Sequence, residues 1–296
     1  MRQRVHAQIL YFILLVLIGV PTGSAHGQAC DVDVPLRPVD RRGEPISSIT
    51  SDQLKARVGS STVPVISISP TPNLGFILLL DTTPSMKEVW KESIAAARQL
   101  ENKAAGNFNL FTFSEKIERY ARTQPQSEDL LNHLLNEGAP KPPRGTALYD
   151  SLIEIAQHTR LRATPIIVIS DGGDNASYHS ADATASLFLR SSWPAVFALI
   201  LDYDETNPRR SYFKRIPEAT GGFVVYPPSA SKVSTAADEL AAVVLNSFAA
   251  KLRLTRAITD STKVSLEVVR PDGKRSKDIK LLYPSELSVH DSCHPN

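Results

Sequence analysis

The sequence lacks several features that mark common enzyme classes. It has 296 residues but only two cysteines. It contains neither a G-x-S-x-G elbow nor an H-E-x-x-H pair, so a serine hydrolase or a zinc peptidase built on those motifs is not indicated. No internal repeat is visible. Acidic and basic residues nearly balance, at 31 Asp or Glu against 33 Lys or Arg, and nothing in that balance indicates a nucleic-acid partner.

A long apolar run occurs at the start of the chain. Residues 1–25 contain Arg2 and Arg4, then 12 apolar residues from Ile9 to Val20, then small residues up to Ala25. This pattern is typical of a secretory signal peptide, and the run is short for a membrane span. We therefore expect a secreted or periplasmic protein without a membrane span after cleavage. An uncleaved anchor is the alternative.

The two cysteines lie near the two ends of the mature chain. In an exported protein an even pair favours a disulfide, so Cys30 and Cys293 are candidates for one bridge, although sequence alone does not show that they meet. Lipidation of Cys30 is the alternative. Gly27 stands three residues before it, where a bulky aliphatic residue is usual.

Patterning divides the mature chain into four parts. Residues 26–72 are predicted to be β-rich, with strands at Val32–Val39, Arg57–Val58 and Val63–Ser69 and a helical turn at Ser51–Ala56. Residues 73–250 form the central domain. Residues 251–284 return to strands, at Lys251–Ala257, Lys263–Arg270 and Asp278–Tyr283, and residues 285–296 are a polar tail. Because neither β-rich part has enough apolar residues for its own core, we expect them to form one satellite against the central domain.

In the central domain, apolar strands alternate with helical patterns, which predicts an α/β fold with a doubly wound, mostly parallel sheet. The second and third strands are expected to form a hairpin-like edge. The predicted strands are Phe76–Leu80, Phe108–Phe113, Ile117–Ala121, Pro165–Ser170, Ala195–Leu201 and Phe223–Tyr226. The predicted helices are Lys87–Lys103, Glu128–Asn136, Ala147–His158, Ala181–Leu189, Tyr212–Ala219 and Thr235–Ala250.

Oxygen-bearing side chains gather where two of these strands end. Asp81, Thr83 and Ser85 follow an apolar run in the stretch GFILLLDTTPSM, Thr146 lies in RGTALYD just before a helix, and Asp171 follows another apolar strand in VISDGGDN. The carboxyl ends of parallel strands meet at one sheet edge, where open α/β sheets bind ligands. Two carboxylates and three hydroxyls around one point suit Mg²⁺ or Mn²⁺.

At these residues the chain resembles a von Willebrand factor type A domain with a metal-ion-dependent adhesion site. That family's motif is Asp-x-Ser-x-Ser, followed by a Thr and an Asp on separate loops, and Thr83 replaces the middle Ser here. The stretch Thr220–Pro227 resembles the family's last strand, and the whole mature chain resembles an exported bacterial subgroup. The resemblance implies a protein-binding module, not an enzyme, whose ion has one position open for an Asp or Glu carboxylate of a protein ligand.

Each motif residue also has a purely structural explanation. Asp81 can form an Asx turn, Ser85 and Thr146 can cap helices, and Asp171 can serve the turn before Gly172. Five such accidents at one sheet edge are much less expected than one site. Four nearby residues, Asp174, Asn175, Asp202 and Asp204, are expected to be loop polar groups, and His179 a solvated loop residue.

Two other functions fit part of the pattern. In a phosphohydrolase of the haloacid dehalogenase type, Asp81 would be the nucleophile, and Asp171 with Asp174 would hold the metal. Thr83 then stands where the general acid is needed, which argues against that function. A structural envelope module without metal is the remaining alternative.

Overall fold

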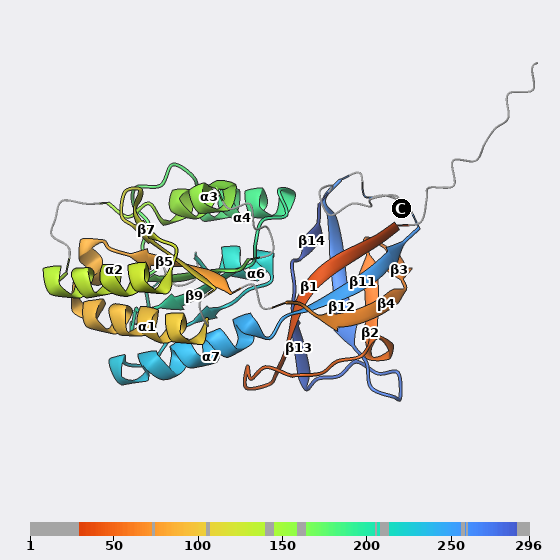
Figure 1. The fold of residues 1–296 in the computed structure, drawn as a ribbon. Coiled ribbons are helices and arrows are strands. Elements are labelled where there is room, and N and C mark those ends of the chain that lie inside the picture. Colours follow the sequence, from red (N-terminus) through yellow and green to blue (C-terminus); the bar gives the residue numbers. More distant parts are fainter. Residues whose placement is uncertain are drawn as a thin grey trace, which may run out of the picture.

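The structure is a computed structural model that describes residues 30–72, 75–104, 107–139, 145–158, 164–204, 206–207, 213–255, 258 and 260–288. Figure 1 shows two units, one with helices around a sheet and one of strands alone. The expected signal peptide lies outside the described residues. Within them, no helix has the length and apolarity that a membrane crossing requires.

The first unit is built on a six-stranded sheet in the order β10-β9-β8-β5-β6-β7. All neighbouring strands are parallel except β6 and β7, which form the expected antiparallel edge. The predicted fold class, a doubly wound α/β sheet, is confirmed. The strands are β5 (Phe76–Asp81), β6 (Phe108–Phe113), β7 (Ile117–Ala121), β8 (Ile166–Ser170), β9 (Val196–Ile200) and β10 (Val224–Val225).

Helices cover both faces of this sheet, which explains why β5 has no polar face. Phe76, Leu78 and Leu80 pack in the core on one face, with α1 (Trp90–Lys103), α2 (Gln124–Glu137) and α7 (Val233–Leu245). Ile77 and Leu79 pack on the other face, with α3 (Leu148–His158), α4 (Ala181–Arg190) and α6 (Arg215–Thr220). Alternate residues of one strand thus supply two cores.

A glycine sets the entry to β5. Gly75 has φ +69°, and a Cβ there would lie 1.7 Å from the backbone oxygen of Asn107. That same oxygen accepts a hydrogen bond from Phe76 N at 3.2 Å. Only glycine fits this close approach, which fixes the register of β5 on β6.

The second unit joins the two ends of the chain. One sheet has the order β13-β1-β11-β4 and the other β14-β12-β2-β3. The strands are β1 (Cys30–Asp40), β2 (Leu54–Val58), β3 (Ser61–Val63), β4 (Val65–Pro70), β11 (Phe248–Leu254), β12 (Thr262–Val268), β13 (Ile279–Leu282) and β14 (Glu286–Leu287). Each sheet mixes early and late strands, and their side chains share one core. The expected joint β-rich region is confirmed.

Several predicted boundaries are wrong. The helix expected over Thr235–Ala250 ends at Leu245, and Phe248 already begins β11. The stripe Leu240, Val244, Phe248 fits a helix, but Phe248 also starts an alternation in which every second residue is buried. The C-terminal part of the second unit therefore begins at Phe248, before the predicted residue 251.

Two predicted boundaries in the flanking segments and one in the central domain also differ from the structure. The helical turn expected over Ser51–Ala56 is a 3-10 turn at Ser51–Gln53, after which β2 begins at Leu54. The expected polar tail from residue 285 first contributes β14 and the buried Ser288. In the central domain, α2 begins four residues before the predicted Glu128, with Pro125 in its first turn.

The disulfide stays a prediction, because Cys293 lies outside the described residues. Cys30 is buried at the start of β1, opposite Leu254 of β11. A bridge to Cys293 would close a loop of more than two hundred residues, for which loop entropy predicts about 4 to 5 kcal/mol of stabilisation. Non-reducing peptide mapping of the mature protein should recover a Cys30–Cys293 linked peptide. Recovery of both thiols unlinked, or of a lipid on Cys30, contradicts the bridge.

Candidate functional site

The candidate site lies where the chain reverses its direction across the sheet. From β5 the chain moves to β6 on one side, and it later returns to β8 on the other side. The carboxyl ends of β5 and β8 therefore flank a topological switch point, the place where open α/β sheets bind ligands. Asp81 ends β5, and Ser170 and Asp171 stand at the end of β8.

Asp81 is a carboxylate without exposed surface. Its Oδ1 accepts hydrogen bonds from Thr83 N at 2.8 Å and from Thr83 Oγ1 at 2.6 Å. Its Oδ2 accepts one from Ser170 Oγ at 2.6 Å. The bond from Thr83 N is the bond that an Asx turn makes, so Asp81 does have the structural role considered in the sequence analysis. The same bond also orients the carboxylate.

Ser170 is a site residue that the sequence analysis missed. It is buried, and its hydroxyl donates to Asp81 and accepts from Gly172 N at 3.0 Å. Its signal in the sequence is a hydroxyl that ends an otherwise apolar strand next to Asp171. Ser170 ties the loop after β8 to the carboxylate that ends β5.

Thr83 and Ser85 place two hydroxyls beside this carboxylate. Thr83 precedes the short 3-10 helix η2 (Pro84–Val89), but its side chain makes no capping bond and turns to Asp81 instead. Ser85 lies within η2, so it is not a helix cap, and its Oγ is 3.0 Å from Thr83 Oγ1. The three predicted residues of this turn are thus brought together.

Thr146 reaches the same edge on a loop that bridges the two sides of β5. Ala147 N donates to Ser114 O, just beyond β6, at 2.8 Å. On the other side Thr146 N donates to Asn175 Oδ1 at 2.7 Å, and Thr146 O accepts from Asn175 N and Ala176 N. Thr146 is 5% exposed, and among the described residues its hydroxyl makes no hydrogen bond.

Asp171 is half-buried, and its Oδ1 accepts from Gly173 N at 2.9 Å, as expected for a turn residue. Its charge lies close enough to act on Asp81. Burial raises the pKa of Asp81 to about 7, against the lowering effect of the bonds from Ser170 and Thr83, and the Asp171 charge raises it further. The structure therefore places two carboxyl groups so close that the charge of one disfavours ionisation of the other.

The donor set fits a hard divalent cation. The buried Asp81 carboxylate needs a counter-charge, and carboxylate and hydroxyl oxygens are the ligands that Mg²⁺ and Mn²⁺ prefer. No group of three or more His, Cys, Asp or Glu among the described residues has metal-binding geometry. That finding leaves the predicted set open, since three of its five members are hydroxyls.

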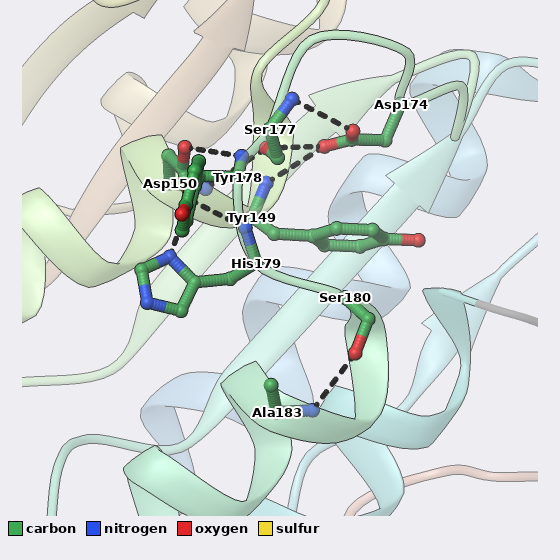
Figure 2. Close-up of polar contacts among 8 residues, drawn as sticks. All are labelled: Tyr149, Asp150, Asp174, Ser177, Tyr178, His179, Ser180 and Ala183. Atoms are coloured by element: carbon green, nitrogen blue, oxygen red, sulfur yellow. Dashed lines mark hydrogen bonds and ion pairs between the residues drawn. The ribbon is translucent and has the colours of Figure 1, made fainter.

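The loop after β8 is held by two further carboxylates (Figure 2). Asp174 Oδ2 accepts from Tyr149 N at 3.0 Å and from Ser177 Oγ at 2.6 Å. Asp150 Oδ2 accepts from Tyr178 N at 2.7 Å. These bonds tie the loop to the first turn of α3, and as expected Asp174 serves the loop.

The same network fixes the exposed end of this loop (Figure 2). Asp150 Oδ1 lies 2.7 Å from His179 Nδ1, so His179 is exposed, as expected, but also bonded. Bonds from the loop's backbone and from His179 lower the pKa of Asp150, although its partial burial acts in the opposite direction. The result is that Tyr178 projects from a fixed backbone with 94% of its surface exposed.

Comparisons with known proteins give matches among solved structures only. No protein-family model and no curated protein matches the chain. Proximal thread matrix protein 1 of the mussel byssus aligns with 62% of this chain and about half, 49%, of its own, at 15% identity and a TM-score of 0.45.

Two further structures have similar scores. The manganese-loaded TRAP protein of Plasmodium vivax aligns at 13% identity over 75% of this chain and 96% of its own, with a TM-score of 0.44. An aerotolerance-related membrane protein of Bacteroides fragilis aligns at 16% identity over 56% and 97%, with a TM-score of 0.42. The fold class given above comes from the strand order and helix packing of this chain.

The raised pKa of Asp81 predicts how stability depends on pH when no metal is present. The native state keeps this proton up to about pH 7, whereas the unfolded chain loses it near pH 3.8. The contribution of the Asp81 proton to the free energy of unfolding is therefore complete below about pH 4. It is lost as the pH rises to 7, by about 1.4 kcal/mol per pH unit. Urea unfolding in EDTA should show this decline for the wild type relative to Asp81→Asn. Parallel pH profiles for the two proteins contradict it.

Proposed function

We propose that this protein is an exported protein-binding module of the von Willebrand factor A type, which holds Mg²⁺ or Mn²⁺ and binds an Asp or Glu carboxylate of a protein partner. The observation that carries the proposal is the set of oxygens at the switch point. They are contributed by Asp81, Thr83, Ser85, Thr146 and Asp171. The ion, when bound, supplies the positive charge that the two carboxylates need and attracts the partner's acid.

The environments of Asp81 and Thr146 support this assignment. Asp81 is oriented by three hydrogen bonds, which leaves little rearrangement for binding. The Thr146 hydroxyl has no hydrogen-bond partner among the described residues, although Thr146 is buried. This hydroxyl is therefore free to bind a cation.

A non-enzymatic role fits the same residues better than phosphoryl transfer does. A phosphohydrolase of the haloacid dehalogenase type needs an acid two residues after its nucleophile, and Thr83 occupies that position with its hydroxyl bonded to Asp81. The purified protein should not hydrolyse a generic phosphate ester. Turnover that Asp81→Asn abolishes would favour the enzyme instead.

Tyr178 is the side chain we assign to partner contact. An exposed aromatic residue on a preorganised loop offers contact area at low entropic cost, and such residues often dominate binding energy. The bonds from Asp150 and Asp174 provide the preorganisation. Partner choice would then be determined by this loop around the ion.

Metal binding should stabilise the native protein. An ion that binds only the folded state raises the free energy of unfolding by about 2.7 kcal/mol at a concentration one hundred times its Kd. Melts in millimolar Mg²⁺ and in EDTA should differ for the wild type and for Thr83→Ser, which keeps the oxygen. The difference should vanish in Thr83→Val, which keeps the shape but loses the oxygen. Identical melts for the wild type, with no heat of Mg²⁺ binding by calorimetry, rule out the site.

Partner capture should require both the ion and Tyr178. The immobilised wild-type protein, incubated with an envelope fraction, should retain a protein in Mg²⁺ that it releases in EDTA. Thr146→Ala should lose that protein, and Tyr178→Ala should retain at least about tenfold less, the loss typical of a strong aromatic contact. Tyr120→Ala, which removes an exposed tyrosine on β7, is the matched control and should behave as the wild type. Retention that is indifferent to EDTA argues against the proposed mode.

A further inference from the structure

A second candidate site lies between the two units, at the opposite end of the sheet from Asp81. It is a cavity of about 410 Å³, a size usual for small-ligand pockets. Gly75, Pro165 and Ala195, which stand just before β5, β8 and β9, line it. A five-residue strand is about 17 Å long, so this cavity is separate from the candidate metal site.

Both units contribute apolar walls to the cavity. Phe188, Trp193 and Pro194 come from the end of α4 and the segment after it, and Phe188 and Trp193 contact each other edge to face with ring centroids 5.0 Å apart. Val244 comes from the last turn of α7, and Leu287 comes from β14. These residues would enclose an apolar body.

One buried cation interrupts these walls. Arg37 of β1 lines the cavity and is only 4% exposed. Its Nε donates to Val244 O at 3.2 Å, and its guanidinium lies 5.0 Å from the ring centroid of Phe197. Among the described residues, no carboxylate lies within ion-pair distance of it.

Arg37 therefore carries a buried charge that no carboxylate of the described residues neutralises. Burial lowers its pKa to about 10, so it remains charged at neutral pH. A backbone carbonyl and an aromatic face each offer partial negative charge, but buried charges in proteins are normally paired. The guanidinium's terminal N–H groups form a planar fork that fits a carboxylate.

Two acidic residues also line the cavity, and neither pairs with Arg37. Asp33 is exposed on β1, where water solvates its charge. Glu286 is bonded to the hydroxyl of Ser261. Among the described residues that line the cavity, Arg37 alone carries a positive charge.

We propose that this cavity binds a small amphipathic monocarboxylic acid, whose carboxylate pairs with Arg37 and whose apolar body lies against Phe188, Trp193 and Val244. The size, the apolar walls and the single buried cation each match one part of such a molecule. A ligand there would contact both units at once. It does not depend on the proposed metal site.

The test uses octanoate, with 1-octanol as an uncharged probe of equal chain length. Trp193 lines the cavity and is one of two tryptophans in the chain, so Trp90→Phe isolates its fluorescence. In this background octanoate should bind saturably, change the fluorescence and raise Tm, and it should bind at least about tenfold more tightly than 1-octanol. Arg37→Met, which keeps a long apolar side chain, should abolish this preference and leave 1-octanol binding unchanged.

Two further variants distinguish ligand binding by Arg37 from a purely structural role of this residue. Arg37→Lys keeps the charge without the fork and should retain weaker octanoate binding. Ala249→Phe keeps Arg37 and places a large side chain where Ala249 lines the cavity, so it should block both probes even if Arg37→Met fails to fold. The proposal is overturned if wild-type binding is not saturable, if octanoate binds no better than 1-octanol, or if Ala249→Phe binds octanoate as the wild type does.

Discussion

The structure depends on a strand that is buried on both faces and ends in a buried carboxyl group. β5 pairs in parallel with β6 on one side and β8 on the other, and its apolar side chains supply both cores of the α/β unit. Its last residue, Asp81, is fully buried and cannot move to solvent without breaking this register. The loops around it are therefore arranged to satisfy one carboxylate.

That arrangement explains why the residues at this edge are interlocked. Ser170 couples the end of β8 to Asp81, Asn175 couples the loop after β8 to Thr146, and Ser114 holds the same loop from the β6 side. Each bond joins segments that are far apart in sequence. A rigid polar edge results, and Tyr178 is the large side chain that stands out from it.

Much of the α/β unit follows from the sequence, because strands covered on both faces show no polar side. The sequence could place the five oxygen-bearing residues at one edge of the sheet because parallel topology brings their turns together there. Ser170 was not predicted, because a serine at the end of a strand can have many local structural roles. The end of α7 was misplaced because Phe248 suits both a four-residue helical stripe and a two-residue strand alternation.

Contacts between the two units were not predictable in the same way. β1 alternates buried and exposed residues up to Leu36, and that pattern would place Arg37 in solvent. Instead α7 and β9 of the other unit cover it, through Val244 O and the Phe197 ring. Nothing local in the sequence signals such burial, because it arises from the packing of segments about two hundred residues apart, as the separation of 207 between Arg37 and Val244 shows.

The pairing of β1 with β11 also imposes an order on folding. Asp31 and Arg253, which form an ion pair across these strands, are 222 residues apart. Long-range strand pairing has a large entropic cost of loop closure. Until the two strands pair, their exposed edges promote aggregation. Once the α/β unit has folded, it holds β4 and β11, which flank it in sequence, close together and shortens the effective loop. Folding of the central unit thus favours the pairing of β1, the first strand to be made, with β11 near the other end of the chain.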